Sequence, residues 1–300
     1  MNYLFYFTSI YSCLRNYFMP YWVLVPCRKV IRYMANKQLP KYFLRTKVAP
    51  NNKQTKRDLI VSFTSFPARI DNVWQVVECM KRQTILPEKI ILWLSNDQFP
   101  NEEIPQSIKD EIDELFEVRF VDGDIRSHKK YYYAAKEYPN SLLFLIDDDI
   151  YYSPSIIEKS LNALKKYPNH IICNYGCRMK YDKNGNIKPY NAWKHIFHDT
   201  LGRDLFFGSG GGTLFRPSDM YKDLTNIDLA IQLTPLADDI WLNTMALKAG
   251  LSKVILSHGP LLSIKNKKNG TLSSVNNGEG RNDEQINAVR KYYGDVFYQQ

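Results

Sequence analysis

The sequence predicts an α/β protein in which a mostly parallel sheet is flanked by helices and followed by a smaller mixed part. Short apolar runs alternate with amphipathic stretches of roughly ten residues, which is the pattern of strand–helix–strand crossovers. The candidate polar residues come directly after the apolar runs, where open α/β sheets bind ligands. A chain of 300 residues is long enough for one large domain or two small ones.

The expected elements follow in chain order. Strands are predicted over residues 59–63, 89–94, 117–121 and 142–146, with helices over 72–83, 104–115, 128–137 and 155–167. After His170 we expect a strand at 171–174, a hairpin around 183–186, a helix over 236–249 and a strand at 253–257. Residues 265–282 are too polar and too rich in Gly and Asn to pack.

Charge is distributed unevenly along the chain. Residues 1–57 hold eleven Lys/Arg and no Asp or Glu, whereas residues 58–300 hold 29 Lys/Arg and 31 Asp/Glu. A nucleic-acid enzyme would carry its positive charge across the binding face, so nucleic acid is not an expected partner. We divide the chain into a basic segment 1–57, which ends in the linker 47–57, and a main domain 58–300 with halves 58–155 and 156–290.

The basic segment is also rich in aromatic residues. Its longest apolar stretch, Tyr17–Pro26, is shorter than the roughly 20 residues of a membrane span, and no basic residue precedes it as in a secretory signal. Aromatic residues mixed with Lys/Arg favour a peripheral contact of residues 1–45 with an anionic membrane surface. The alternatives are a helical extension packed on the domain and a partner contact. Five scattered cysteines favour a cytoplasmic location, here at the inner face of the cell membrane.

The most informative motif is the triple aspartate Asp147-Asp148-Asp149, which follows the apolar run 142–146. Burying an unpaired carboxylate costs several kcal/mol, so these charges must lie at the carboxyl end of the strand. Alternating carboxylates there suit Mn2+ or Mg2+, which in turn bridges to phosphate oxygens. The motif therefore predicts a metal-dependent site for a phosphorylated donor. The alternative is a cap for the following helix, for which one aspartate suffices.

Two further motifs favour a phosphorylated ligand or a sugar. Lys129 or Lys130 lies at a predicted helix start, where exposed N–H groups and cationic side chains suit a diphosphate. The alternative is a solvated basic turn. The glycine run 208–212 lacks the Gly-Lys-Ser/Thr of a phosphate-binding loop. Its glycines would instead let the backbone approach a sugar closely, unless the run is a flexible surface turn.

Taken in order, several motifs resemble the nucleotide-sugar-dependent glycosyltransferases of the Rossmann-like GT-A fold. More narrowly, the chain resembles the bacterial family-2-like enzymes of surface-polysaccharide (capsule or O-antigen) biosynthesis, over about residues 58–290. The motifs are VSFTSFPARI (61–70), QTILPEKIILWLS (83–95), RSHKKYYYA (126–134), LIDDDIYY (145–152), GSGGGTLF (208–215) and ADDIW (237–241). The resemblance implies a nucleotide-sugar donor, with uridine diphosphate as the family's usual nucleotide, and a glycan or lipid-linked acceptor.

The resemblance also assigns residues to the donor and the metal. Asp149 is the stronger metal ligand, Asp147 bridges the metal and the donor, and Asp148 is structural or touches the sugar. His258, after the last predicted strand, would be a third ligand, although a lone histidine is more often an ordinary one. Residues 265–282 could then close over the donor as a lid. The residues expected to hold the base and ribose are Thr64, Ser65, Pro67 and Arg69; those expected to approach the sugar are Gly210, Gly211 and Gly212.

Catalysis is assigned to an acidic pair at a helix start. Asp239 resembles the base that takes the proton from the acceptor hydroxyl in inverting members, and Asp238 would orient it or contact the acceptor. The family often has Glu at the first position, where Asp238 is shorter by one methylene. Acidic residues at helix starts also serve simply as dipole complements. His195 and His198 are expected to be surface residues.

Three other classes compete with a glycosyltransferase. A magnesium-dependent nucleotidyltransferase would normally need a Gly-rich loop with Lys or Arg in the first strand–helix turn, where this chain has Thr64-Ser65-Phe66-Pro67. A phosphohydrolase would place its nucleophilic aspartates after the first strand, where Ser62 and Thr64 stand. The third class is a catalytically inactive glycan- or nucleotide-binding protein, against which the metal carboxylates and the acidic pair argue.

Overall fold

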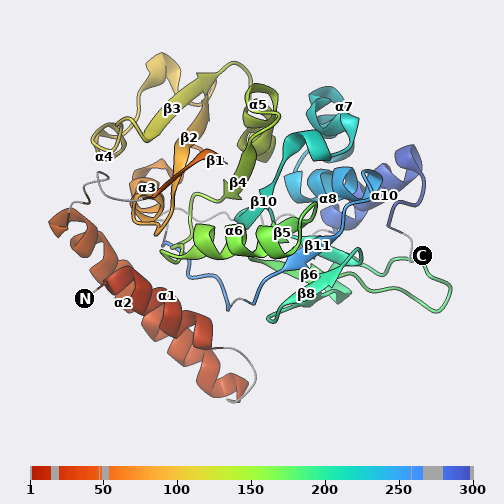
Figure 1. The fold of residues 1–300 in the computed structure, drawn as a ribbon, viewed down its shortest axis with the longest axis horizontal. Coiled ribbons are helices and arrows are strands. Elements are labelled where there is room, and N and C mark those ends of the chain that lie inside the picture. The colour runs from red at the N-terminus through yellow and green to blue at the C-terminus, as the bar shows by residue number, and fades with distance from the viewer. Residues whose placement is uncertain are drawn as a thin grey trace.

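A computed structural model describes residues 2–14, 20–46, 48, 54–257, 259–265 and 280–297. Within them, an eight-stranded sheet has the order β3-β2-β1-β4-β10-β5-β11-β8, and a smaller sheet has the order β7-β6-β9 (Figure 1). The large sheet comprises β1 (Thr55–Thr64), β2 (Leu86–Ser95), β3 (Phe116–Val121), β4 (Leu142–Ile146), β5 (Ile171–Cys173), β8 (Thr200–Gly202), β10 (Gly211–Phe215) and β11 (Lys253–Ile255). The small sheet comprises β6 (Gly176–Arg178), β7 (Lys194–His195) and β9 (Leu205–Phe207). The expected fold class is therefore confirmed.

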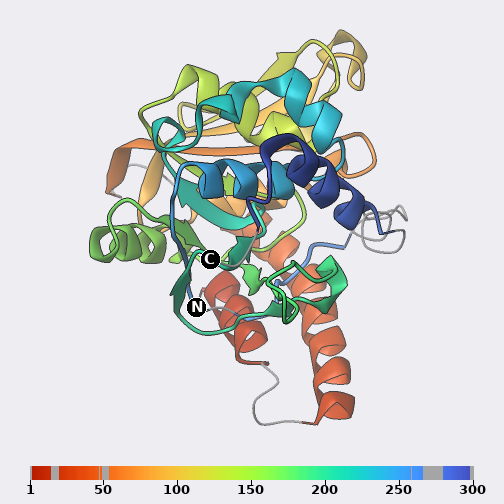
Figure 2. The same ribbon diagram turned by 90° about the vertical axis from the view of Figure 1, so that its right-hand side faces the viewer.

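Helices cover both faces of the large sheet (Figures 1 and 2). Successive strand side chains point to opposite faces, so Val61 joins one buried apolar cluster and Ile60 the other. The helices of the first cluster are α3 (Trp74–Lys81), α4 (Gln106–Lys109) and α6 (Ile156–Lys166), joined by the N-terminal α1 (Tyr3–Cys13) and α2 (Tyr21–Arg45). Those of the second are α5 (Lys129–Glu137), α7 (Ile227–Leu233), α8 (Asp238–Lys248) and α10 (Arg281–Tyr293).

The strand directions bring distant motifs together. β1 pairs in parallel with β2 and β4, so the loops after these strands leave the sheet at the same edge. β10 runs antiparallel between β4 and β5, and Gly211 lies opposite Ile146. A register shift follows at Gly212, whose φ of +97° suits glycine. The glycine run therefore enters the sheet beside the triple aspartate.

Two helices, α1 (Tyr3–Cys13) and α2 (Tyr21–Arg45), form a hairpin that packs on the domain and extends beyond its α/β body (Figure 2). The ring of Phe43 lies 6.3 Å from that of Trp74 and 6.5 Å from that of Tyr151. The guanidinium of Arg82 lies 4.9 Å from the centre of the Phe43 ring and donates a 2.5 Å hydrogen bond to the carbonyl of Thr46. The part of the chain described here contains no helix with both the length and the apolar character needed to cross a membrane.

Two expected segments differ in extent. The helix expected over 104–115 is reduced to α4, because Asp113 Oδ1 accepts the backbone N–H groups of Leu115 and Phe116 in a turn that leads into β3. β1 begins at Thr55, inside the expected linker; residues 47 and 49–53 of that linker lie outside the described residues.

The prediction that residues 265–282 do not pack is wrong at its last residue, Asn282. This residue is buried in the first turn of α10. The helix packs here through polar groups: Asp283 Oδ1 accepts the N–H of Tyr190 at 2.8 Å, and Gln285 Oε1 accepts that of Leu236 at 2.9 Å. A polar sequence can therefore pack when it satisfies the backbone of a neighbouring loop. Residues 266–279 lie outside the described residues.

Candidate active site

A cavity of about 620 Å³ opens where the carboxyl ends of β1 and β4 meet the N-terminal ends of α5 and α8. Of the residues proposed from the sequence, Pro67 and Gly212 are absent from the cavity lining described by the structure, and His258 lies outside the described residues. The proposed residues that line it are Thr64, Ser65, Arg69, Lys129, Lys130, Asp147, Asp148, Asp149, Gly210, Gly211, Asp238 and Asp239.

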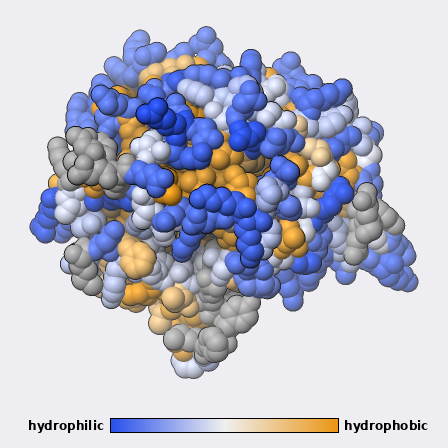
Figure 3. Space-filling view, in the orientation of Figure 1, coloured by the Kyte–Doolittle hydropathy of each residue, from blue (hydrophilic) through white to orange (hydrophobic). Residues whose placement is uncertain are grey.

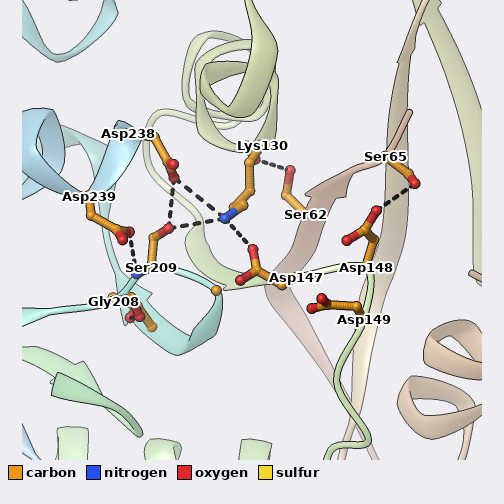
Figure 4. Close-up of polar contacts among 12 residues, drawn as sticks. Ser62, Ser65, Lys130, Asp147, Asp148, Asp149, Gly208, Ser209, Asp238 and Asp239 are labelled. Carbon is orange, nitrogen blue, oxygen red and sulfur yellow. Dashed lines mark hydrogen bonds and ion pairs between the residues drawn. The ribbon is translucent and has the colours of Figure 1, made fainter. Parts of the chain in front are cut away.

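Asp148 turns away from its two neighbours toward the loop after β1 (Figure 4). Its Oδ2 accepts a 2.6 Å hydrogen bond from Ser65, and its Oδ1 lies 2.8 Å from a terminal nitrogen of Arg69. Burial raises the pKa of Asp148, while the nearby charge of Arg69 and the bond from Ser65 oppose that shift. Two of the proposed donor residues therefore fix the β1 loop against the end of β4.

Lys130 lies at the centre of the site (Figure 4). Its ammonium nitrogen lies 2.5 Å from Asp147 Oδ1, 3.1 Å from Ser209 Oγ and 3.5 Å from Asp238 Oδ2. Burial lowers the pKa of Lys130, but the surrounding aspartates outweigh it and the net pKa is raised, so the side chain stays charged. Its backbone carbonyl accepts a 2.5 Å bond from Ser62 of β1. One buried cation thus ties β4, the glycine loop and α8 together.

Asp238 and Asp239 begin α8 and differ in their environment. Burial tends to raise the pKa of Asp238, but Lys130 and the 2.7 Å hydrogen bond from Ser209 Oγ bring it below its ordinary value. The pKa of Asp239 is raised to about 7 by burial and by the adjacent charge of Asp238. Its Oδ1 accepts a 2.6 Å bond from the backbone N–H of Ser209. The first carboxylate is therefore held ionised, and the second can exchange a proton near neutral pH.

The helix start expected to bind a diphosphate is largely buried. The side chain of Lys129 is 2% exposed and forms an ion pair with Asp124. Burial lowers the pKa of Lys129, against the raising effect of Asp124. His128 Nε2 lies 2.7 Å from the carbonyl of Thr234, and its Nδ1 lies 3.1 Å from the hydroxyl of Tyr131. An Nε2–H tautomer satisfies both contacts, which fixes α5 against the loop before α8.

The glycine loop packs on the triple aspartate. A Cβ on Gly210 would lie 1.8 Å from Asp147 Oδ2, and one on Gly211 would lie 2.2 Å from Cβ of Tyr175. The hydroxyl of Tyr152 accepts the N–H of Asp147 at 2.7 Å and donates to the carbonyl of Gly210. These glycines therefore allow close approach of the loop to protein side chains, while Gly210 and Gly211 still line the cavity.

Asp147 and Asp149 fit a hard divalent cation. Their side chains are 40% and 23% exposed at the cavity, and Asp149 Oδ2 lies 3.0 Å from Arg69. Burial and the charges of Asp148 and Asp147 raise the pKa of Asp149 to about 7. Crowded carboxylates of this kind are relieved by a cation, and oxygen ligands suit Mg2+ or Mn2+. No cluster of three or more His, Cys, Asp or Glu side chains in a ligating arrangement is present among the described residues.

Several cavity residues were missed by the sequence analysis. Gln98 follows β2 and Asp124 follows β3, so the strand-end rule that found the aspartates could have found both. Tyr175, Tyr190 and Phe206 come from the small sheet and its connections, and they face the same cavity as Asp239. The ring centres of Tyr190 and Phe206 lie 5.7 Å apart. No local pattern marks these aromatic residues, because only the tertiary fold brings them to the site.

Comparison with known proteins assigns no family. No protein-family model and no curated protein sequence matches the chain. Among solved structures, HddC from Yersinia pseudotuberculosis is similar with a TM-score of 0.34 and 14% identity over 55% of this chain and 78% of that one. A CMP:2-keto-3-deoxy-manno-octonic acid synthetase complexed with CTP gives 0.41 and 10%, and a 4-diphosphocytidyl-2C-methyl-D-erythritol synthase gives 0.44 and 12%, each over 71% of this chain and 94% of the other. None of the three is named a glycosyltransferase, and all are too distant to assign a reaction, so the chemistry is argued from the cavity.

Proposed function

We propose that the protein is a nucleotide-dependent transferase, and more narrowly a metal-dependent, inverting glycosyltransferase. Its donor would be a nucleotide-sugar with a uridine diphosphate leaving group, and its acceptor a hydroxyl of a glycan or lipid-linked saccharide. The observation that carries the proposal is the acidic pair Asp238-Asp239 on one wall of the cavity, whose environments diverge: Asp238 lies 3.5 Å from the ammonium of Lys130 and accepts from Ser209 Oγ, whereas Asp239 accepts from the backbone N–H of Ser209. Such a divergence is typical of sites that assign separate roles to two carboxylates.

In this mechanism Asp239 acts as the general base. It takes the proton of the acceptor hydroxyl as that oxygen bonds to the anomeric carbon and the bond from this carbon to the diphosphate breaks. Asp238 stays ionised beside Lys130 and Ser209, and its charge adds to the burial that raises the pKa of Asp239. The aromatic rings of Tyr175 and Tyr190 line the same part of the cavity, where an acceptor sugar would bind.

The donor would bind at the edge of the sheet between β1 and β4. Asp147 and Asp149 would hold Mn2+ or Mg2+, with His258 as the third ligand expected from the motif resemblance. When bound, the cation supplies positive charge to the departing diphosphate. Thr64, Ser65 and the newly recognised Gln98 line the part of the cavity that is expected to receive the nucleoside.

Nucleotidyl transfer is the competing reaction, because it uses the same combination of carboxylates and divalent cation. In that reaction a triphosphate would need cationic groups in the turn after β1. The cation of that turn, Arg69, pairs with Asp148 and Asp149. The geometry of this turn therefore supports glycosyl transfer over nucleotidyl transfer.

The test compares two products in one set of reactions with Mn2+ or Mg2+. Release of a nucleoside diphosphate is measured from a panel of nucleotide-sugars, and release of pyrophosphate from nucleoside triphosphates with sugar 1-phosphates. Asp239→Asn is the test variant, and Asp228→Asn is its matched control, because Asp228 lies in the first turn of α7, exposed and absent from the described cavity lining.

We expect metal-dependent diphosphate release that Asp239→Asn reduces by about 100-fold or more, while nucleotide binding and the activity of Asp228→Asn are unchanged. Pyrophosphate release would overturn the glycosyl assignment in favour of nucleotidyl transfer. Nucleotide binding with neither product would identify a binding protein.

A further inference from the structure

The α1–α2 hairpin carries a surface that the proposed transfer reaction does not use. Eight of the exposed residues of α2 recur at helical spacing within about a third of its circumference, while Arg32, Met34 and Arg45 are exposed outside that sector. Trp22 is 76% exposed, Tyr33 67% and Leu44 70%. Large exposed side chains in one stripe mark an interaction surface. The stripe consists of Trp22, Pro26, Lys29, Val30, Tyr33, Lys37, Lys41 and Leu44.

The charge of the hairpin selects the kind of partner. Its described part carries six Lys/Arg and no Asp or Glu. Lys29, Lys37 and Lys41 lie between apolar members of the stripe, an arrangement that suits lipid headgroups and the outer acyl region together. A second copy of the chain, docked symmetrically on the same stripe, would place lysines opposite lysines without a single acid to offset them. An anionic lipid surface meets both the charge and the apolar groups.

The hairpin is also joined to the wall of the cavity. Asn36 Nδ2 donates to the carbonyl of Ser263 at 3.1 Å, and Asn36 Oδ1 accepts the N–H of Lys265 at 2.7 Å. A Cβ on Gly259 would lie 2.2 Å from Cα of Ser12, so the same segment packs closely on α1. Ser263 and Leu261 line the cavity. The surface that would meet a membrane is therefore separated from the proposed active site by one short segment.

The figures show where the hairpin lies relative to the α/β body. The two helices extend from the α/β body in Figure 2. In the space-filling view, white and orange atoms lie over the lower left of the molecule, where the hairpin lies in Figure 1, and a separate orange area lies over its middle (Figure 3).

We propose that the stripe on α2 docks on an anionic lipid surface and thereby holds the cavity beside it. The evidence for docking comes from the hairpin and does not depend on the proposed function. A second inference does rest on that function: the acceptor would be a saccharide anchored in that membrane, because an enzyme held at a surface meets surface-bound acceptors at a raised effective concentration.

The experiment is sedimentation of the full chain with vesicles of phosphatidylcholine alone or with 30 mol% phosphatidylglycerol. The first variant is Lys29→Gln/Lys37→Gln/Lys41→Gln. Its matched control is Lys159→Gln/Lys165→Gln/Lys166→Gln, which removes the same charge from exposed positions of α6. A second variant, Trp22→Ser/Tyr33→Ser, removes apolar groups without changing charge. Molar mass in solution and circular dichroism are recorded for each protein.

We expect the full chain to bind the anionic vesicles and not the neutral ones, and binding to weaken as salt rises. The α2 lysine variant should lose about 100-fold in affinity, at roughly fivefold per lysine, and the α6 control should lose no more than a few-fold. The Trp22/Tyr33 variant should bind more weakly in proportion to the apolar surface removed. Equal binding by the lysine variant and the α6 control would overturn the proposal, as would a dimer that the Trp22/Tyr33 variant dissociates.

Diphosphate release from a nucleotide-sugar in the absence of vesicles separates this proposal from the proposed function. The α2 variants should keep that activity. A protein that docks but releases no diphosphate supports the membrane surface and contradicts the transferase.

Discussion

Gly210 and Asp147 lie so close that a Cβ on residue 210 would be 1.8 Å from Oδ2 of the aspartate. Asp147 can therefore hold its place only while residue 210 has no side chain. Tyr152 joins the same two segments, since its hydroxyl accepts the N–H of Asp147 and donates to the carbonyl of Gly210. The glycine loop and the triple aspartate thus form one unit, although about sixty residues of sequence separate them.

Gly210→Ala is expected to displace Asp147 and to weaken metal-dependent nucleotide binding by about 10- to 100-fold, the usual cost of disturbing a group that orients a metal ligand. Titration calorimetry with uridine diphosphate and Mn2+ measures this effect. Gly250→Ala is the control: a Cβ on Gly250 would meet open space, so this variant adds a methyl group without a collision, although at a φ of +76° that strains the backbone. Equal affinities for the two variants would contradict the proposed role of Gly210.

Lys130→Met is expected to destabilise the fold by about 3–5 kcal/mol, because Asp147 and Asp238 would lose the buried cation that compensates them. Urea unfolding followed by circular dichroism measures the free energy. Lys136→Met removes an exposed lysine from the same helix and should change it by less than about 0.5 kcal/mol. If Lys130→Met lowered the free energy of unfolding no more than Lys136→Met, the result would contradict the prediction that Asp147 and Asp238 need the buried cation.

The sequence predicted β1 to β5, β11 and the strand-end position of the triple aspartate, because these follow from local pattern, whereas the short strands β6 to β10 were not predicted. An apolar run that ends in three aspartates has one place in an α/β sheet, and the structure puts Asp147–Asp149 at the cavity. The role of Lys130 was harder to foresee. Its neighbours Asp147, Ser209 and Asp238 come from three separate segments. The sequence therefore does not distinguish a lysine that contacts a diphosphate in solvent from a buried lysine that pairs with several protein groups.

The aromatic side of the cavity left no local signal. Tyr190 belongs to a short irregular stretch whose backbone is held by Asp283 of α10, a contact between residues far apart in the chain. The same contact explains why the polar start of α10 packs. Hydrophobic periodicity detects apolar burial, whereas this region is fixed by side-chain acceptors for backbone N–H groups.

Activity is expected to rise with pH through about 7 if Asp239 is the base. Its pKa is raised to about 7, so below that pH the carboxyl is protonated and cannot accept the proton of the acceptor. A profile of kcat/KM against pH under saturating metal measures the inflection. Ser209→Ala removes the hydrogen bond to Asp238 and should raise the pKa of the acidic pair, which moves the inflection to higher pH. An inflection that stays in place in this variant, or one near 4 in the parent protein, would contradict the assignment.

Stability in the absence of metal is expected to fall as pH rises from about 4 to about 7, in part because of Asp149. Its pKa in the folded state is raised from 3.8 to about 7, so between these values the folded protein keeps a proton that the unfolded chain releases. Folding is therefore favoured below the unfolded pKa, and this advantage is lost as pH passes through the folded pKa. The difference in unfolding free energy between the parent protein and Asp149→Asn, measured across this range, isolates the contribution of this one group.

Mn2+ should reverse the loss, because binding requires the ionised carboxylate and acts only on the folded state. At pH 8 the melting temperature should rise with Mn2+, and the rise should shrink as pH falls below 7. Asp149→Asn should abolish it, whereas Asp110→Asn, an exposed carboxylate at the end of α4, should leave it intact. A rise of equal size in the parent protein and in Asp149→Asn would place the cation elsewhere.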